Sequence, residues 1–297
     1  MKSEGYSIIT ETPGVGATAE QLSAIYTRYH FAARHAAGKD VLEVACGVGN
    51  GLGYLARFAQ RVVGGDIEDA NVQIAQDTYR DDENIELHKM DAHRLPFPDR
   101  SFDLLLLFEA LYYLEDAEQF ISEAFRVLRP GGKLLLSTVH PSWPGFNPSP
   151  LSHRYYTSQE LRELAQSAGL APTIYAGFAA TPQTMLGSAI GLLRRVAVRF
   201  GLVPRSMRGK TLLKRLFYGQ LKPIPRIVDE FTGALEPLRK VGPDTPEECF
   251  KFLYMEAQRQ STKFVPANRP EINEPASPPA TDDFSTFRST TMAPPEG

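Results

Sequence analysis

Cysteine is scarce in this chain, and its scarcity excludes two kinds of site. The 297 residues contain only Cys46 and Cys249, which lie far apart and lack the close spacing of metal ligands. We therefore predict neither a disulfide framework nor a zinc site, and no bound metal. Long hydrophobic runs are also missing, since no segment has about 18 uninterrupted apolar residues. The start MKSEGYSIIT lacks the charged-then-apolar pattern of a secretory signal, so the sequence predicts a cytoplasmic protein.

An excess of charge of either sign is missing as well. The formal net charge is -3, which gives no overall attraction to nucleic acid. The composition is 42% hydrophobic and 23% charged, which is typical of neither a fibrous nor a wholly disordered chain. A chain of 297 residues can build one substantial core and an accessory element, so we expect one α/β domain with additions.

Hydrophobic spacing in the first half of the chain predicts alternating helices and strands. Residues 20–37 place Leu22, Ile25 and Tyr29 at helical spacing, and Gly38 can end that helix. Further runs typical of strands or helices follow at Val41–Ala45, Leu52–Phe58, Arg61–Gly65, Asn71–Tyr79, Ile85–Lys89, Phe102–Phe108, Ala117–Leu128 and Lys133–Thr138. This alternation predicts βαβ units and a parallel sheet, which is an α/β fold.

The segment that follows carries signals for a helix end, a helix and a strand. Arg129-Pro130-Gly131-Gly132 combines a helix breaker with permissive glycines, so we expect it to end the preceding helix. Ser158 can cap a helix over residues 159–168, and a strand is predicted near residues 172–178. A last strand is predicted at residues 250–256.

Residues 180–249 form an insertion of roughly 70 residues, which is too long for an ordinary loop and favours a helical subdomain. Between residues 180 and 226 every charged side chain is basic, including Arg194, Arg195 and Arg199. Such a segment suits a lid over a phosphate-bearing ligand, docking on an anionic membrane surface, or a cap whose arginines are merely solvated. Few aromatic residues accompany the basic ones, so nucleic acid is disfavoured as a partner.

A glycine-rich turn follows the first predicted strand. Val41-Leu-Glu-Val-Ala-Cys-Gly-Val-Gly-Asn-Gly51 places glycines where the backbone can approach a ligand closely. A dinucleotide fingerprint needs a glycine at the sixth position from Gly47, where this chain has Leu52. About 20 residues beyond the turn, Asp66 ends the second predicted strand, where a carboxylate can accept both ribose hydroxyls. Asp91 follows the next strand, so the pattern indicates a nucleoside site more strongly than a plain strand-to-helix turn.

Four ordered segments resemble the motifs of one family. VLEVACGVGNG, VVGGDIED, MDAHRLPFPDRSFDLLLLFEALYYLED and EAFRVLRPGGKLLLST are similar to those of class I S-adenosylmethionine-dependent methyltransferases. The resemblance covers about residues 20–178 and implies a Rossmann-like, seven-stranded, mostly parallel sheet with an antiparallel last strand. It implies S-adenosylmethionine as the cofactor. Glu43 and Ala45 depart mildly from the usual Asp and Gly of the first motif.

The resemblance also implies which residues bind that cofactor. The methionine portion, the ribose, the adenine and the sulfonium side are each assigned to neighbouring residues. In chain order the expected contacts are Tyr29, Glu43, Ala45, Gly47, Gly49, Asp66, Ile67, Asp91, Ala92, Phe108 and Glu109. Tyr29 has packing on the sheet as an equal alternative. The expected division is a helical lid at 1–38, the cofactor-binding core at 39–179, a basic helical insertion capping the acceptor at 180–249, the last strand at 250–262 and a disordered tail at 263–297.

Methyl transfer sometimes needs a base, and His140 follows the fifth predicted strand at the ligand-binding edge of the sheet. We therefore predict His140 as the catalytic residue, with a loop-bracing role as its alternative. Tyr112 or Tyr113 is expected to line the acceptor pocket. The sequence lacks the Asp/Asn-Pro-Pro-Tyr/Phe motif of nucleobase-amine methyltransferases.

We therefore expect methyl transfer to an oxygen or nitrogen atom of a small molecule, possible classes being a sugar, a glycan intermediate or a natural-product intermediate. The alternatives are a membrane-surface or RNA-associated methyltransferase and a catalytically idle cofactor-binding module.

Overall fold

The computed structural model describes residues 11–180, 221–242, 245 and 249–260. The chain divides into two compact units, Met1–Phe264 and Val265–Gly297, and the described residues all belong to the first. The predicted tail and most of the predicted basic helices, including Arg194, Arg195 and Arg199, lie outside the described residues.

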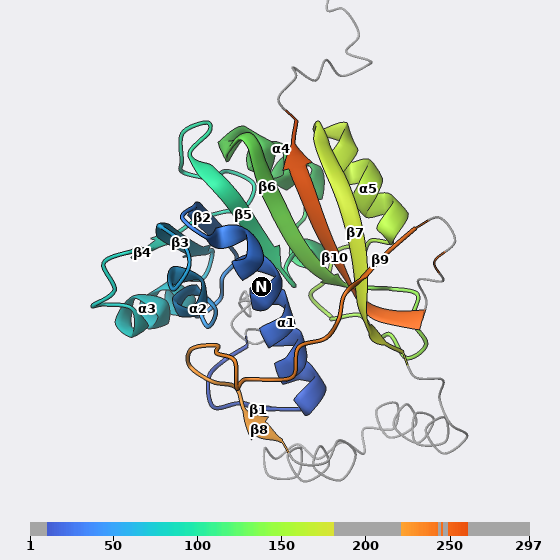
Figure 1. Cartoon of the computed structure of the whole chain (residues 1–297), viewed down its shortest axis with the longest axis horizontal. Helices are drawn as coiled ribbons and strands as arrows, with labels where there is room; N and C mark the ends of the chain where they lie inside the picture. The colour runs from blue at the N-terminus through green and yellow to red at the C-terminus, as the bar shows by residue number, and fades with distance from the viewer. Residues whose placement is uncertain (1–10, 181–220, 243–244, 246–248, 261–297) are drawn as a thin grey trace, which may run out of the picture. The chain divides into compact units, whose positions relative to one another are not determined.

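A mixed sheet forms the centre of the fold (Figure 1). In the described residues its order is β4-β3-β2-β5-β6-β10-β7-β9. Its strands are β2 (Asp40–Val44), β3 (Arg61–Asp66), β4 (Ile85–Lys89), β5 (Phe102–Phe108), β6 (Leu128–Val139), β7 (Leu170–Ala179), β9 (Arg239–Lys240) and β10 (Phe250–Arg259). The first five strands in the order pair in parallel, whereas β10 is antiparallel to β6 and β7. The Rossmann-like fold and the antiparallel last strand are confirmed, and the two-residue β9 adds an eighth strand to the expected seven.

The helices are α1 (Ala19–Ala36), α2 (Leu52–Ala56), α3 (Asp69–Thr78), α4 (Ala117–Val127) and α5 (Ser158–Ser167), with a 3-10 turn η2 at Leu111–Tyr113. Thr18 caps α1 in a capping box with Gln21, which supplies two backbone N–H groups at the helix start with partners. Thr157 caps α5 in the same way, so the expectation that Ser158 is the cap was wrong by one residue. No helix in the described ranges is long and apolar enough to cross a membrane.

The alternation of side chains along β5 explains why helices cover both faces of the sheet. Leu104 and Leu106 are buried with side chains of α1 and α2, whereas Leu105 and Leu107 are buried with those of α4 and α5. Figure 1 shows α1 in front of the sheet and α4 and α5 behind it. A strand buried on both faces reads as a continuous apolar run, which is the pattern of β5.

The end of α4 differs from the sequence expectation. The helix ends at Val127, and β6 begins at once with Leu128, so the Arg-Pro-Gly-Gly segment lies inside the strand. Gly131 has a φ of 79°, and the pairing of β5 with β6 is irregular between Phe102 and Leu104. The breaker residues therefore stop the helix as expected, but they continue as an irregular strand start instead of a turn.

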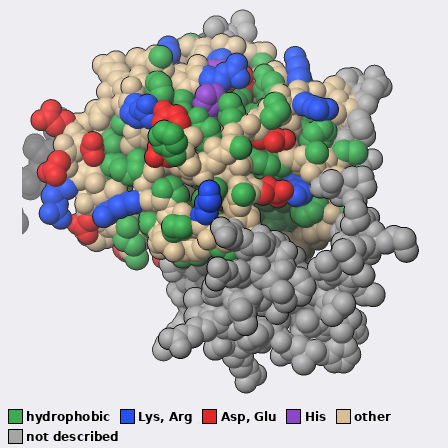
Figure 2. Space-filling view, turned by 60° about the horizontal axis from the view of Figure 1, so that its bottom comes forward, with side chains coloured by type: hydrophobic (Ala, Val, Ile, Leu, Met, Phe, Trp, Pro, Cys, Tyr) green, Lys and Arg blue, Asp and Glu red, His purple; other side chains and the backbone are tan. Residues whose placement is uncertain are grey.

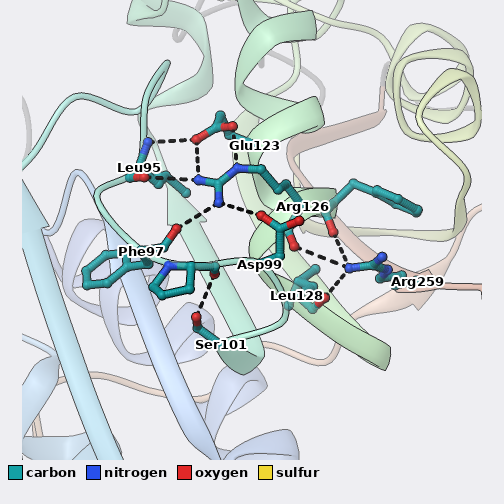
Figure 3. A network of polar contacts seen from close by, with 10 residues as sticks. Leu95, Phe97, Asp99, Ser101, Glu123, Arg126, Leu128 and Arg259 are labelled. Atoms are coloured by element: carbon teal, nitrogen blue, oxygen red, sulfur yellow. Dashed lines mark hydrogen bonds and ion pairs between the residues drawn. The ribbon is translucent and has the colours of Figure 1, made fainter.

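A polar network ties α4 to the loop between β4 and β5 (Figure 3). The guanidinium of Arg126 donates to Glu123, to Asp99 and to the carbonyl oxygens of Leu95 and Phe97, over distances of 2.7 to 3.0 Å. Glu123 in turn accepts a hydrogen bond from the backbone N–H of Leu95. This network fixes the loop that leaves the carboxyl end of β4.

The described end of the insertion, residues 221–242, contains two short strands and no helix. Strand β8 (Lys222–Pro223) pairs antiparallel with β1 (Gly16–Ala17), and β9 pairs with β7. The segment also contacts α1, because the backbone N–H of Glu236 donates to Thr27. The returning chain therefore packs beside the N-terminal segment, close to the edge where the parallel strands end.

Candidate active site

A cavity of about 530 Å³ lies at the carboxyl edge of the parallel strands. Its lining includes residues that directly follow β2, β3 and β5 and residues just beyond β4. The chain runs from β2 to β3 and β4 on one side of β2 and then crosses to β5 on the other side, and this change of direction creates the crevice where ligands bind in open α/β sheets. Figure 2 views the molecule from nearer this edge, and on its described part acidic, basic and hydrophobic side chains are interspersed.

The glycine turn after β2 supplies one wall of the cavity. Ala45 and Gly47 line it, with φ angles of 55° and 58°. The left-handed region is favourable for glycine and costs an alanine roughly 1 kcal/mol. Ala45 therefore carries backbone strain at the position where the sequence motif usually has glycine. The turn holds the backbone open toward the cavity in spite of that cost.

Asp66 holds the turn in place from the end of β3. One carboxylate oxygen accepts the Gly47 backbone N–H at 2.9 Å, and the other accepts the Glu68 N–H at 2.9 Å and the Asn71 amide at 3.1 Å. The side chain is only 7% exposed, yet it lines the cavity. Each carboxylate oxygen has two lone pairs, so Asp66 can still accept from a bound hydroxyl at the cavity surface.

Asp91 and His93 form a pair at the nucleoside end of the cavity. Asp91 Oδ1 lies 2.7 Å from His93 Nδ1 and accepts the His93 backbone N–H at 2.9 Å. The Asp116 backbone N–H donates to His93 Nε2 at 3.3 Å, so the imidazole proton resides on Nδ1. The His93 backbone bond is the main reason that the pKa of Asp91 is lowered. Asp91 is thus an anion that can accept a hydrogen bond from an amino group.

Tyr29 and Glu43 form a buried pair under the cavity. The Tyr29 hydroxyl donates to Glu43 Oε1 at 2.7 Å, and both residues line the cavity. Burial raises the pKa of Glu43 to about 7, although the Tyr29 bond and the positive charge of Arg28 lower it. Glu43 Oε2 is buried and makes no hydrogen bond with a described residue. That oxygen needs a donor from a ligand, which an ammonium group would supply.

Arg28 brings a buried positive charge to the same wall. Its guanidinium is paired with Glu11, through Nη1 at 3.2 Å and through a second contact of Nη2. Burial lowers the pKa of Arg28, but the charges of Glu11 and Tyr29 outweigh that effect and raise it. A cation fixed beside the buried carboxyl of Glu43 gives the cavity groups of both signs, as an amino-acid ligand requires.

Glu109 lies at the end of β5 with a φ of 53°, which is unusual for a residue other than glycine. Its carboxylate accepts the Ser137 hydroxyl at 3.0 Å and the Tyr112 hydroxyl at 3.3 Å. Desolvation raises the pKa of Glu109 to about 7, against the lowering effect of Arg28. The side chain is partly exposed, and it lines the cavity.

Aromatic side chains from η2, which follows β5, and from β10 line one part of the cavity, and we call this part the aromatic end. Tyr112, Tyr113 and Phe252 belong to its lining. Tyr112 stacks on Tyr155 with ring centroids 4.7 Å apart, and Phe252 packs edge-on against Phe178 at 5.3 Å. The predicted acceptor-lining role of Tyr112 and Tyr113 thus agrees in position with the aromatic end, which suits an apolar or ring-bearing molecule.

Most residues predicted to bind the cofactor lie around this one cavity. Those in the lining are Tyr29, Glu43, Ala45, Gly47, Asp66, Ile67, Asp91, Ala92, Phe108 and Glu109. Gly49 is not among them. It has a φ of 79°, and a Cβ there would lie 3.0 to 3.2 Å from Leu52, Ala75 and Tyr79. Its observed place is therefore in the packing of the turn against α2 and α3.

The structure does not bring His140 to the cavity lining. The residue is 2% exposed, and its backbone N–H donates to the Lys251 carbonyl oxygen at 2.8 Å, which continues the pairing of β6 with β10. Following a strand at the ligand edge is therefore not sufficient to place a side chain in the site. The residue that follows β5 does line it.

Sequence reasoning missed several lining residues, notably Glu11, Arg28, Asn50 and Phe252. A signal existed for Arg28, because it adjoins Tyr29 on a helix whose other buried residues are mostly apolar. Glu11 precedes the first regular element among the described residues, and its position depends on tertiary contacts: Asn50 donates to its carbonyl oxygen at 3.0 Å. Nothing in the local sequence indicates that contact.

Comparisons with known proteins agree with this geometry. Residues 42–136 match a family described as a methyltransferase domain. A Mycolicibacterium smegmatis protein named "Probable S-adenosylmethionine-dependent methyltransferase" is 38% identical over 147 residues, which are 48% of this chain and 55% of that protein. The phthiotriol/phenolphthiotriol dimycocerosates methyltransferase 1 of Mycobacterium ulcerans is 39% identical over 118 residues, which are 38% of this chain and 43% of that protein. The chain thus matches about half the length of these relatives.

The solved structure of the [4+2]-cyclase SpnF is similar with a TM-score of 0.54 and 20% identity, covering 84% of this chain and 86% of that one. At this identity the similarity shows the fold alone. A Rossmann-like sheet with a glycine turn and two acids at its carboxyl edge defines a domain that binds a nucleoside cofactor. Residues 42–136 therefore form a methyltransferase domain similar to the class I S-adenosylmethionine-dependent methyltransferases, and the cofactor of that domain is S-adenosylmethionine.

The cavity fits that cofactor. Asp66 can accept hydrogen bonds from the ribose hydroxyls, and Asp91 can accept one from the adenine amino group. Glu43 Oε2, which is buried and has no hydrogen-bond donor among the described residues, can accept one from the amino group of the methionine portion. Arg28 has the charge to hold the methionine carboxylate. Phe108 and Glu109 lie where the positive sulfonium is expected, and an aromatic face and a carboxylate both stabilise a cation.

Proposed function

We propose that this protein transfers a methyl group from S-adenosylmethionine to an oxygen or nitrogen atom of a small molecule. The observation that carries the proposal is the single cavity in which the nucleoside-side acids, Asp66 and Asp91, are continuous with an aromatic end at Tyr112 and Phe252. A cofactor and an acceptor can therefore lie end to end in one desolvated space. Alignment of two reactants in that way supplies much of the rate of a displacement reaction.

The chain's own residues would contribute binding, orientation and exclusion of water. Asp66 and Asp91 hold the nucleoside, and Glu43 and Arg28 hold the two charged groups of the methionine portion. When bound, the cofactor supplies an activated methyl group on a positive sulfonium. Tyr112 and Phe252 exclude water from the acceptor side, which strengthens the electrostatic interactions inside the cavity.

We further propose that the acceptor is an apolar or ring-bearing molecule, such as a natural-product or glycan intermediate. The aromatic end of the cavity supports this class, and the M. ulcerans relative is named for phthiotriol and phenolphthiotriol dimycocerosates. A phosphate-bearing or sugar-bearing acceptor, a basic insertion that caps it and a cytoplasmic location stay predictions. The expected domain division, with 1–38 as a lid and 180–249 as a cap, also stays a prediction.

Calorimetric titration with S-adenosylmethionine, S-adenosylhomocysteine and NADH tests the first half of the proposal. Micromolar binding of the first two compounds and none of NADH is expected. A screen of alcohols, phenols, amines and sugar nucleotides with methyl-labelled S-adenosylmethionine then tests transfer. Lack of cofactor binding by the folded protein would overturn the proposal.

One second function has a specific observation in its favour. The similarity to a cyclase means that this fold alone does not entail methyl transfer. A cofactor-binding module without transferase activity would bind S-adenosylmethionine tightly and transfer no label to any acceptor pool. Recovery of a methylated product from a cell extract would exclude that alternative.

The membrane-surface alternative has a test of its own. Replacement of Arg194, Arg195 and Arg199 by Ala should abolish binding to vesicles that contain anionic lipid if the basic segment docks there, and salt should weaken the wild-type interaction. The same variant should lose RNA binding if the partner is RNA. Unchanged binding to both partners would remove these three arginines from either role.

A further inference from the structure

We propose that Glu109 is the general base of this site, and that the acceptor atom is the oxygen of a hydroxyl group whose proton Glu109 takes. This inference rests on the proposed function and deepens it, because it names both the substrate class and a catalytic residue. The sequence indicated Glu109 only as a neighbour of the sulfonium.

The position of Glu109 favours that role. It follows β5 directly, at the boundary between the cofactor part of the cavity and the aromatic end formed by Tyr112 and Phe252. Its backbone is in the left-handed region, where a residue other than glycine loses about 1 kcal/mol of conformational stability. Strain of this kind at a cavity wall is typical of residues whose side-chain direction matters to the site.

The contacts of Glu109 also favour a proton acceptor. Ser137 and Tyr112 each donate a hydroxyl hydrogen bond, one to each carboxylate oxygen. Two donors orient the carboxylate and leave lone pairs on both oxygens for a third partner in the cavity. Ser137 is 1% exposed and Tyr112 is 7% exposed, so both donors are fixed by packing.

Burial and charge poise this carboxylate for proton exchange near neutral pH. Its pKa is raised to about 7 by desolvation, and a base with a pKa near the working pH is the most effective. Charged and titratable groups face it from every neighbouring element. They are Glu11 from the N-terminal segment, Arg28 from α1, Tyr112 and Tyr113 from η2 and Tyr254 from β10. Arg28 opposes the effect of desolvation and keeps a useful fraction ionised.

Other candidates among the described residues are less suitable. Glu43 is engaged by Tyr29 on the methionine side. Both ring nitrogens of His93 are engaged, by Asp91 and by the backbone of Asp116. His140 does not belong to the cavity lining. Glu109, by contrast, lines the cavity and accepts a hydrogen bond directly from Tyr112 of the aromatic acceptor end.

The proposed step balances as follows. The acceptor oxygen forms the new C–O bond to the methyl carbon while the electron pair of the S–CH₃ bond returns to sulfur, which leaves S-adenosylhomocysteine. The hydroxyl proton passes to a carboxylate oxygen of Glu109. The carboxylic acid then releases that proton to solvent when the products leave. A neutral alcohol needs such a base, because its own pKa is far above neutrality.

The test compares Glu109→Gln and Glu109→Asp with Glu118→Gln, which makes the same chemical change on an exposed residue of α4. In protein labelled with ¹³C at the glutamate carboxyls, Glu109→Gln should remove one carboxyl that titrates near pH 7. The affinity of this variant for S-adenosylhomocysteine should stay within about threefold of wild type, which corresponds to a change in binding free energy of about 0.65 kcal/mol. These two readouts need no acceptor.

With the hydroxyl acceptor found in the screen, Glu109→Gln should lower kcat by about 10²–10⁴-fold, and the limb of the pH profile near 7 should disappear. Glu109→Asp should recover part of the activity. His140→Ala is the competing variant and should keep the wild-type limb. Normal kcat and pH dependence in Glu109→Gln would overturn the inference, as would loss of the limb in His140→Ala alone. Failure of the proposed function itself would appear in the wild-type protein, as cofactor binding without any transfer.

Discussion

The Gly51→Ala substitution tests the position of the Tyr29 ring, on which the methionine end of the cavity depends. Gly51 precedes α2 with a φ of -97°, which any residue can adopt, so an alanine brings no backbone strain. A Cβ at this position would lie 1.8 Å from Tyr29 Cε1 and 1.9 Å from Cζ. These atoms cannot coexist, and the ring must move.

The ring has little room to move. It is 3% exposed, packs edge-on against Phe108 at 5.5 Å and holds the hydroxyl that donates to Glu43. Overpacking costs about 1–3 kcal/mol, and leaving the Glu43 carboxyl without its partner adds about 1–3 kcal/mol. We expect Gly51→Ala to lower the free energy of unfolding by roughly 2–6 kcal/mol and to weaken S-adenosylhomocysteine binding at least about tenfold.

Urea unfolding monitored by circular dichroism measures the first effect, and calorimetry measures the second. Gly242→Ala is the matched control, because the nearest atom of a described residue to its Cβ is Thr245 Oγ1 at 3.8 Å, and it should be neutral within about 0.5 kcal/mol. In the Tyr29→Ala background the added methyl group should cost much less, since the clash is gone. A Gly51→Ala protein as stable as wild type would refute this reasoning.

Further predictions concern pH, the polar network and the ribose site. The pKa of Glu43 is about 7 in the folded chain against a usual 4.5, so the protonated side chain contributes stability that is fully present below pH 4.5. About 3 kcal/mol of this stability is lost as the pH rises to about 7. Urea unfolding of wild type and Glu43→Gln between about pH 4.5 and 8 measures the loss, and an equal dependence of the unfolding free energy on pH in the two proteins would contradict it. Arg126→Lys should cost about 1–3 kcal/mol in the same assay, because an ammonium cannot replace the planar fork, whereas Arg80→Lys in an exposed pair should cost under about 0.5 kcal/mol. Asp66→Ala should weaken cofactor binding by roughly 1–3 kcal/mol in calorimetry, and unchanged affinity would remove Asp66 from the site.

The sequence predicted much of the sheet because its strands are buried on both faces and separated by glycine or polar turns. The bounds of β4 and β5 agree with the expected ranges; Asp66 ends β3, Asp91 follows β4, and the ends of these two strands meet at one edge. The start of β6 was not predicted, because Leu128 already pairs with Phe102 of β5, and Pro130 and Gly131 lie in the irregular stretch before regular pairing resumes at Lys133. Local preference decides an element only where tertiary contacts do not oppose it.

The site was predictable where a residue's place follows from the end of a strand, and it was not where packing decides. Glu109 and Asp66 belong to the first kind. His140 also follows a strand, but its backbone N–H donates to the Lys251 carbonyl oxygen of β10 and so extends the pairing of β6 with β10. Its side chain does not line the cavity. The contact of Glu11 with Arg28 joins residues 17 positions apart through the tertiary fold, which no periodicity reveals.

The place of β10 between β6 and β7 has a consequence for how the chain folds during synthesis. The two neighbours have already left the ribosome when residue 250 appears, and until then each has an unpaired edge that can associate with another chain. The excursion from Ala179 to Phe250 delays the closing strand but costs little at equilibrium, because doubling the length of a loop adds only about 0.6 kcal/mol. A chain that stops short of residue 250 would therefore be prone to aggregate while still containing every residue that is expected to bind the cofactor.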